Sequence, residues 1–331
     1  MKNCIYFNIA DYDICKSSYT IEPVFQNYLK TKIDYILSNN PVNSIKSDDI
    51  PSDFFKIITH REFNCQLANK IVQWKETVVR EAGMYVSKNE PIKIYFALGG
   101  GYKASLDVLN FNTLNYSIGL GELLVIYQIK KLDEKIKQIY KPGITFNIVI
   151  DNGVANYVNN IPREKTLHYC NLLKKLIVKL RMDHCINLII QTENLNWDEN
   201  IKKISYTPLK LKEISERQHA NVMRFLGRKC TYEEALMLQN KYNACMLISG
   251  QIIKQAREND LWFLQYSNNG ELTFRSFPGG VCRIQVGDIA LVNNHKVIPF
   301  SLSTENIKNY NPFCYKINFE NFFKLMHIMN I

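Results

Sequence analysis

A lysine and a serine follow three glycines in the stretch KIYFALGGGYKAS, residues 93–105. The backbone amides of Gly99, Gly100 and Gly101 could hold a phosphate, and Lys103 would add a positive charge. A partly buried lysine here could instead act as a base or form a Schiff base with a ketone. Because the stretch matches neither of the two common glycine-rich nucleotide patterns, a tight turn beside a sheet is an equally simple interpretation.

Two carboxylates could supply acid-base chemistry. Asp151 directly follows the apolar run ITFNIVI, where a carboxylate could bind a substrate amine, a hydroxyl or a metal. Its alternative role is to cap the Asp-Asn-Gly turn. Glu122 falls in the first turn of a predicted helix, where a favourable interaction with the helix dipole is the simpler explanation.

A basic segment, ERQHANVMR, places Arg217, Asn221 and Arg224 near one face of a predicted helix, with His219 at its edge. Two arginines and a histidine suit a phosphate or carboxylate clamp, and a solvated helix face is the alternative. The nine cysteines show no C-x-x-C pattern, so we expect neither a metal site nor a disulfide framework. Since His184 and Cys185 are adjacent in sequence, we expect their side chains to diverge rather than form a nucleophilic pair.

These residues must be positioned by alternating strands and helices. Apolar runs at 92–98, 144–150 and 186–190 predict buried strands, and helical patterns at 121–140 and 163–181 fall between them. Such an order predicts an α/β fold with a Rossmann-like, mostly parallel sheet and helices on both faces. The site of such a sheet lies at the carboxyl ends of its strands, here Gly99–Lys103, Asp151–Gly153 and Gln191–Glu193.

The second half of the chain has a different pattern. Residues 211–227 and 231–258 look helical, and residues 261–302 alternate short β-rich runs with turn signals, which predicts an antiparallel meander of about four or five strands. Two earlier segments, 22–39 and 61–82, are further helix candidates. We therefore expect a Rossmann-like α/β domain over residues 1–205, which carries the site, and a smaller helical and antiparallel β domain over residues 206–331.

Composition narrows the class of partner. The 331-residue chain has a formal net charge of +10, which suggests an anionic partner such as a phosphorylated metabolite, with nucleic acid as the less favoured choice. No apolar run is long enough to cross a bilayer, and the N-terminus lacks the pattern of a secretory signal. Scattered cysteines without a framework fit reduced thiols, so we expect a cytoplasmic protein that does not bind membranes.

Residues 92–180 resemble the isocyanide (isonitrile) synthase family of the pyoverdine-chromophore and dityrosine type. The similarity lies in the order of its motifs: a strand leading into a lysine-serine loop, a glycine-glutamate element, a helix ending in IY-x-PG, and a strand ending in an aspartate. These motifs correspond to Lys103, Ser105, Gly121, Glu122, Tyr140, Pro142, Gly143 and Asp151. Because GGGYKAS replaces the proline- and phenylalanine-rich loop of the family, we expect a divergent member.

The resemblance implies an enzyme that converts the α-amine of an amino acid, such as Tyr or Trp, to an isonitrile. Ribulose 5-phosphate would supply the carbon, no metal or other cofactor would be required, and an oxygenase would act downstream. Lys103, Asp151 and Glu122 would be catalytic. The substrate-binding residues would be Gly99, Gly100, Gly101, Ser105, Arg217, His219 and Arg224.

Two alternatives remain open from the sequence. The first is a different amino-acid-modifying enzyme on the same scaffold, including one that uses aminoacyl-tRNA. The second is a basic module that binds nucleic acid or a partner protein without catalysis, for which affinity would fall steeply with salt.

Overall fold

The structure is a computed structural model of the 331-residue chain. It describes residues 4–5, 31, 33–38, 42–64, 71–98, 120–150, 154–158, 162–190, 197–203, 207–226, 228–257, 261–263, 289–293, 296–300 and 314–316.

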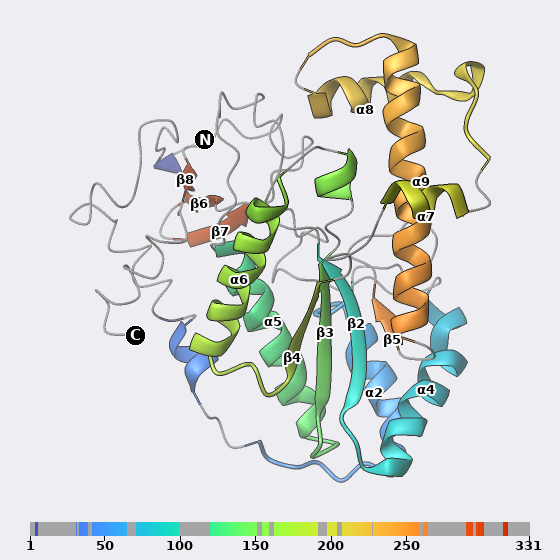
Figure 1. The fold of residues 1–331 in the computed structure, drawn as a ribbon. Helices are drawn as coiled ribbons and strands as arrows, with labels where there is room; N and C mark the ends of the chain where they lie inside the picture. Colours follow the sequence, from blue (N-terminus) through green and yellow to red (C-terminus); the bar gives the residue numbers. More distant parts are fainter. Residues whose placement is uncertain are drawn as a thin grey trace.

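A parallel sheet forms the centre of the described fold (Figure 1). Its strands are β2 (Ile92–Leu98), β3 (Ile144–Ile150), β4 (Ile186–Ile190) and β5 (Leu261–Phe263), in the order β4-β3-β2-β5. The first three are the strands that the sequence predicts, with the same bounds. They pair in register from Ile92 opposite Ile144 and from Phe146 opposite Ile186. The prediction of a mixed α/β fold with a parallel sheet is therefore confirmed, whereas coverage of both faces by helices stays a prediction.

Two helices connect these strands. Helix α5 (Leu120–Lys137) joins β2 to β3, and helix α6 (Arg163–Lys179) joins β3 to β4. Apolar residues recur at helical spacing along this segment, which predicts one buried face, and Val125, Ile129, Leu132 and Ile136 are indeed buried. Together with Phe146 and Ile148 of β3 and the apolar face of α6 they form the main core. Ile139, predicted for the same face, lies beyond the end of α5 and is partly buried against the core. The helices contact each other, and each contacts a strand of the sheet.

The predicted antiparallel meander is not supported as a continuous unit. Its first segment, β5, pairs parallel with β2 and becomes the edge strand of the central sheet. The segment that follows, 264–288, lies outside the described residues. Strands β6 (Ile289–Asn293) and β7 (Lys296–Phe300) pair antiparallel, and β8 (Cys314–Lys316) and β1 (Cys4–Ile5) both pair antiparallel with β6. A three-residue run carries no local signal for its partner, which explains the error at β5. The division of the chain at residue 205 stays a prediction.

The amino-terminal helices differ from the prediction. Helix α2 (Ile50–Thr59) was not predicted, although Asp49 caps it by accepting a hydrogen bond from the backbone N–H of Ser52 at 3.1 Å. The helix predicted over 61–82 is wrong at its start, because residues 61–63 form a turn. The helical part consists of η1 (Val72–Trp74) and α4 (Lys75–Lys88).

The helices predicted in the second half are present. They are α8 (Glu216–Leu226) and the long α9 (Tyr232–Arg257), with the short elements α7 (Trp197–Lys203) and η4 (Leu211–Glu213) before them. Figure 1 shows α8 near the first turns of α9 and α7 crossing α9 further along. Among the described residues, no helix combines the length and the apolar character that crossing a membrane requires.

Gly143, in the predicted helix stop between α5 and β3, has a backbone conformation that a side chain would strain. Its φ is +70°, and an added Cβ would lie 2.5 Å from Asp133 Oδ1 and 2.8 Å from Lys137 Cε. We expect Gly143→Ala to lower the free energy of unfolding by about 2–3 kcal/mol, since the left-handed conformation alone costs a non-glycine residue about 1–3 kcal/mol.

Urea denaturation followed by circular dichroism measures this effect. Gly83→Ala in α4 is the matched control, because its added Cβ would meet only Pro51 Cγ, at 3.8 Å. That variant should be neutral or up to about 1 kcal/mol more stable, as alanine is favoured over glycine within a helix. Equal midpoints for the two variants would contradict the argument.

Candidate active site

The carboxyl ends of β2 and β3 define the edge of the sheet at which a site is expected. Figure 1 shows that α5 and α6 begin at this edge and run back along the sheet. Because these are crossover helices between parallel strands, their first turns must lie beside the strand ends. Side chains from the start of α5 and the first half of α6 can therefore meet there.

Glu122 and Tyr169 meet at this place. Glu122 lies in the first turn of α5 and Tyr169 lies on α6, and both are fully buried. The Tyr169 hydroxyl donates a hydrogen bond of 2.9 Å to Glu122 Oε1. A buried carboxylate is costly unless it is paired or hydrogen-bonded, and here a rigid phenol holds one of its oxygens. The arrangement fixes the direction of the carboxylate, which is what acid-base catalysis requires of its proton carrier.

A π-helical turn, η3 (Val154–Val158), lies between β3 and α6. Its Asn156 donates from Nδ2 to Thr166 Oγ1 at 3.2 Å, and the buried Thr166 hydroxyl donates to the Arg163 carbonyl oxygen at 2.8 Å. These bonds hold the turn against the first turn of α6. Turns of this kind are rare and frequently occur at functional sites.

Helix α9 also contacts η3. Val158 packs with Cys245 and Ile248 of α9. Lys241 of the same helix places its Nζ 4.1 Å from the centre of the Tyr157 ring, a cation–π contact. The turn η3, which follows β3, thus contacts both α6 and α9, and Lys241 contributes positive charge beside this turn.

Most of the predicted loop residues lie outside the described part of the chain. They are Gly99, Gly100, Gly101, Lys103, Ser105 and Asp151. Their roles stay predictions. Of the three residues predicted to be catalytic, Glu122 is the one that the structure describes.

The predicted anion clamp lies on α8. Arg217 is exposed, and the side chain of Arg224 lies outside the described residues. His219 lies at the corner between α8 and α9, where its Nε2 is 2.9 Å from the Cys230 carbonyl oxygen and its ring stacks on Tyr232 with centroids 4.0 Å apart. His219 therefore has a structural role in this corner, and the clamp stays a prediction.

Sequence reasoning missed Tyr169 and Thr166. Both are buried on the face of α6 that also carries Leu173 and Leu176. The available signal was a tyrosine and a threonine at helical spacing within an apolar stripe. A polar group in that position needs a buried partner, which Glu122 supplies for Tyr169.

The pair His184 and Cys185 does not form an activated nucleophile. Burial, followed by the charge of Asp133, raises the pKa of the Cys185 thiol to about 12, so the thiol is protonated at neutral pH. The expectation that the two side chains diverge is nevertheless wrong. They approach each other and Asp133, because residues 180–185 form turns in which consecutive side chains do not alternate as they do in a strand.

Comparisons with known proteins agree with this architecture. The family model of pyoverdine/dityrosine biosynthesis proteins matches residues 113–260, which include Glu122, Asp151, Tyr169 and the whole of α8. The match begins after the loop 99–105. No curated protein gives a significant sequence match.

A solved structure is similar in fold. The crystal structure of the PvcA protein from Pseudomonas aeruginosa superposes with a TM-score of 0.51 at 13% sequence identity, covering 69% of this chain and 84% of that one. The resemblance predicted from the sequence is thereby confirmed: residues 113–260 match the model of the pyoverdine/dityrosine biosynthesis family, and the fold is similar to that of PvcA.

Proposed function

We propose that this protein is an isocyanide-synthase-like enzyme that converts the α-amine of an amino acid to an isonitrile, with ribulose 5-phosphate as the carbon donor. The amine would condense with the C2 ketone of the sugar phosphate, and proton transfers and carbon–carbon cleavages would leave that carbon on nitrogen. Such chemistry needs a phosphate grip, acid-base groups near the ketone and a pocket for the amino acid.

The observation that carries the proposal is the buried Glu122–Tyr169 pair at the carboxyl edge of the sheet. It lies within the segment that matches the family model. In the sequence, Lys103 comes soon after the end of β2 and Asp151 comes directly after β3, so we expect both near the carboxyl edge of the sheet. Lys103 would polarise the ketone, and Asp151 and Glu122 would bind the amine and move protons.

Isotope-traced mass spectrometry tests the proposal. The purified protein is incubated with each amino acid and ribulose 5-phosphate labelled with carbon-13 at C2, and products are searched for a new isonitrile that carries the label. Lys103→Ala and Asp151→Asn proteins that remain folded should form much less product. Unchanged turnover in both variants would remove these residues from the mechanism.

A second candidate is supported by one departure from the family pattern. The loop 99–105 reads GGGYKAS and falls outside the segment that the family model matches. A changed loop could serve another amino-acid transformation, including one that starts from aminoacyl-tRNA, which the charge of +10 would favour. Detection of a labelled isonitrile would exclude this candidate, and the absence of an isonitrile from every mixture would favour it.

A further inference from the structure

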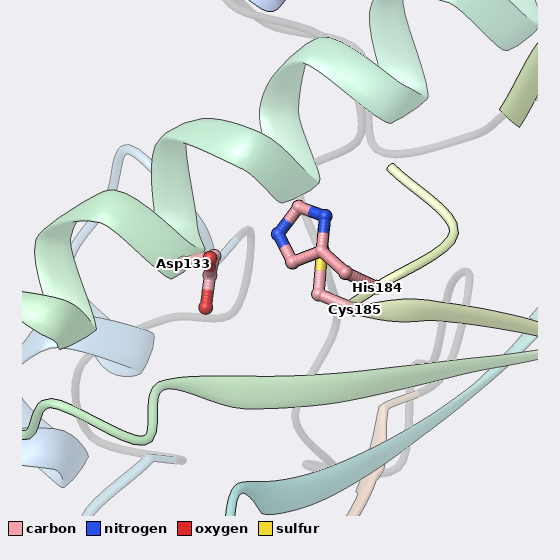
Figure 2. Close-up of side chains that lie close together, drawn as sticks. All are labelled: Asp133, His184 and Cys185. Carbon is pink, nitrogen blue, oxygen red and sulfur yellow. The ribbon is translucent and has the colours of Figure 1, made fainter. Parts of the chain in front are cut away.

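We infer that Asp133, His184 and Cys185 form a binding site for a divalent cation of the zinc class, at the opposite edge of the sheet from the proposed active site. One ligand atom from each residue lies within 4.8 Å of the other two. Figure 2 shows the three side chains converging from α5 and from the turn before β4. Asp133 and Cys185 are buried and His184 is exposed, so the cluster has protein on one side and solvent on the other.

The imidazole of His184 is oriented in the manner typical of a metal ligand. Its Nδ1 lies 2.9 Å from the Arg181 carbonyl oxygen. Since a carbonyl can only accept, Nδ1 carries the hydrogen, and in the neutral imidazole Nε2 is then the nitrogen with the lone pair. Figure 2 shows the other nitrogen of the ring turned toward Asp133. A backbone carbonyl that fixes the tautomer is the usual outer partner of a metal-bound histidine.

Asp133 is held in place by contacts that leave it able to coordinate. Its Oδ1 accepts a hydrogen bond of 3.1 Å from the backbone N–H of Ile144, and its Oδ2 is 2.5 Å from Lys137 Nζ. Each carboxylate oxygen has two lone pairs, so these bonds do not exhaust the acceptor capacity. The partly exposed Lys137 side chain can turn toward water when a cation takes its place.

The ligand types select the cation. Sulfur, imidazole nitrogen and carboxylate oxygen together suit zinc and cobalt, whereas magnesium and calcium prefer oxygen alone. Cys185 would bind as a thiolate and release its proton to the buffer, and with Asp133 it would balance the two positive charges. Zinc lies roughly 2.0–2.3 Å from such ligands. The ligand atoms, which lie within 4.8 Å of one another, must therefore draw closer when the ion binds, and water would take the fourth position.

The site is distant from the proposed chemistry. Asp133 follows Glu122 by eleven positions on α5, a rise of roughly 16 Å along the helix. A cation bound there would link the last third of α5 to the turn before β4. We therefore expect it to stabilise the fold rather than to take part in turnover, and this inference stands independently of the proposed function.

Cobalt titration provides the test. The full chain, treated with a chelator and then freed of it, is titrated with Co²⁺ and followed through the thiolate-to-cobalt charge-transfer band and the visible bands of tetrahedral cobalt. The expected stoichiometry is one bound ion per chain. Zn²⁺ should displace the cobalt, and the melting temperature should rise with Zn²⁺ concentration.

Variants locate the binding. His184→Ala and Cys185→Ala should each weaken binding about tenfold or more, and Cys185→Ala should also remove the charge-transfer band. His168→Ala and Cys170→Ala are the matched controls, one exposed histidine and one buried cysteine of α6, and should bind as the unaltered protein does. His184→Ala changes an exposed side chain, so loss of folding would not obscure the result. Absence of the bands from the unaltered protein, or full binding by both site variants, would overturn the inference.

Discussion

Glu122→Gln should lower kcat for isonitrile formation by roughly 10²–10⁴-fold, the range in which loss of a positioned acid-base group falls. Glutamine keeps the shape of the side chain and an oxygen that can accept from the Tyr169 hydroxyl, but it cannot carry the proton. Because glutamine has the same shape and can retain the contact with Tyr169, we expect the melting temperature to change little. The loss should therefore appear in kcat rather than in the yield of folded protein.

Two companion variants make this result interpretable. Tyr169→Phe removes the hydroxyl that orients Glu122 Oε1, so kcat should fall by an intermediate factor, about tenfold. Glu164→Gln alters an exposed glutamate in the first turn of α6 and should leave kcat unchanged. If Glu122→Gln turns over as fast as the Glu164→Gln control, Glu122 is a structural carboxylate at a helix start and not part of the chemistry.

Strand bounds in the central sheet could be predicted because each strand carries its own signal. IKIYFAL, ITFNIVI and INLII are apolar runs of five to seven residues, rich in β-branched side chains and followed or preceded by turn residues. Buried parallel strands are expected to look like this. β5 has only three residues, and its pairing with β2 depends on packing between segments far apart in the chain.

The residues at the start of α2 form a pattern from which this helix could have been predicted. Asp49, followed by Pro51 in the first turn, is a typical helix start. Phe63, by contrast, has the burial expected of the predicted helix but lies in a turn. The spacing of the apolar residues therefore predicted correctly that the Phe63 side chain is buried, but it predicted the wrong backbone conformation for this residue.

The candidate site likewise has one part that could be predicted from the sequence and one that could not. The position of Glu122 at a helix start is a local property, readable from the spacing of the apolar residues that follow it. Its partner Tyr169 is 47 residues away, and no local pattern names a partner at that separation. The convergence of Asp133 with His184 and Cys185 is likewise tertiary, since it depends on where the end of α5 meets the turn before β4. Sequence can therefore propose which side chains carry chemistry, while their pairing follows only from the fold.

Lys130→Met should cost about 3–5 kcal/mol of unfolding free energy, the range for removing one partner of a buried, hydrogen-bonded charge. The Lys130 ammonium donates to the carbonyl oxygens of Tyr35, Ile36 and Ser38 and lies 3.5 Å from Glu134 Oε1. These carbonyls end the helical segment of residues 33–37, whose Ile33 and Ile36 belong to the main core. Methionine fills the same space but leaves the carbonyls without this donor.

Glu134 would then keep the Tyr35 hydroxyl, which donates to its Oε2 at 2.8 Å. Burial, together with this hydrogen bond, raises the pKa of Tyr35, so the hydroxyl remains a donor throughout the neutral range. One neutral donor does not replace an ammonium beside a partly buried carboxylate. The destabilisation should therefore be concentrated where the amino-terminal segment meets α5, and limited proteolysis should cleave near residue 38 before the sheet is attacked.

The neighbouring lysine is the matched control for this prediction. Lys131 forms an ion pair with Glu62, and both side chains are about one-third exposed. Lys131→Met should therefore cost only about 0–1 kcal/mol, as is usual for solvent-screened pairs. Urea midpoints measured by circular dichroism compare the two variants directly. Equal midpoints would mean that the amino-terminal segment is held by its apolar side chains alone, because the two substitutions are chemically identical and differ only in what each ammonium contacts.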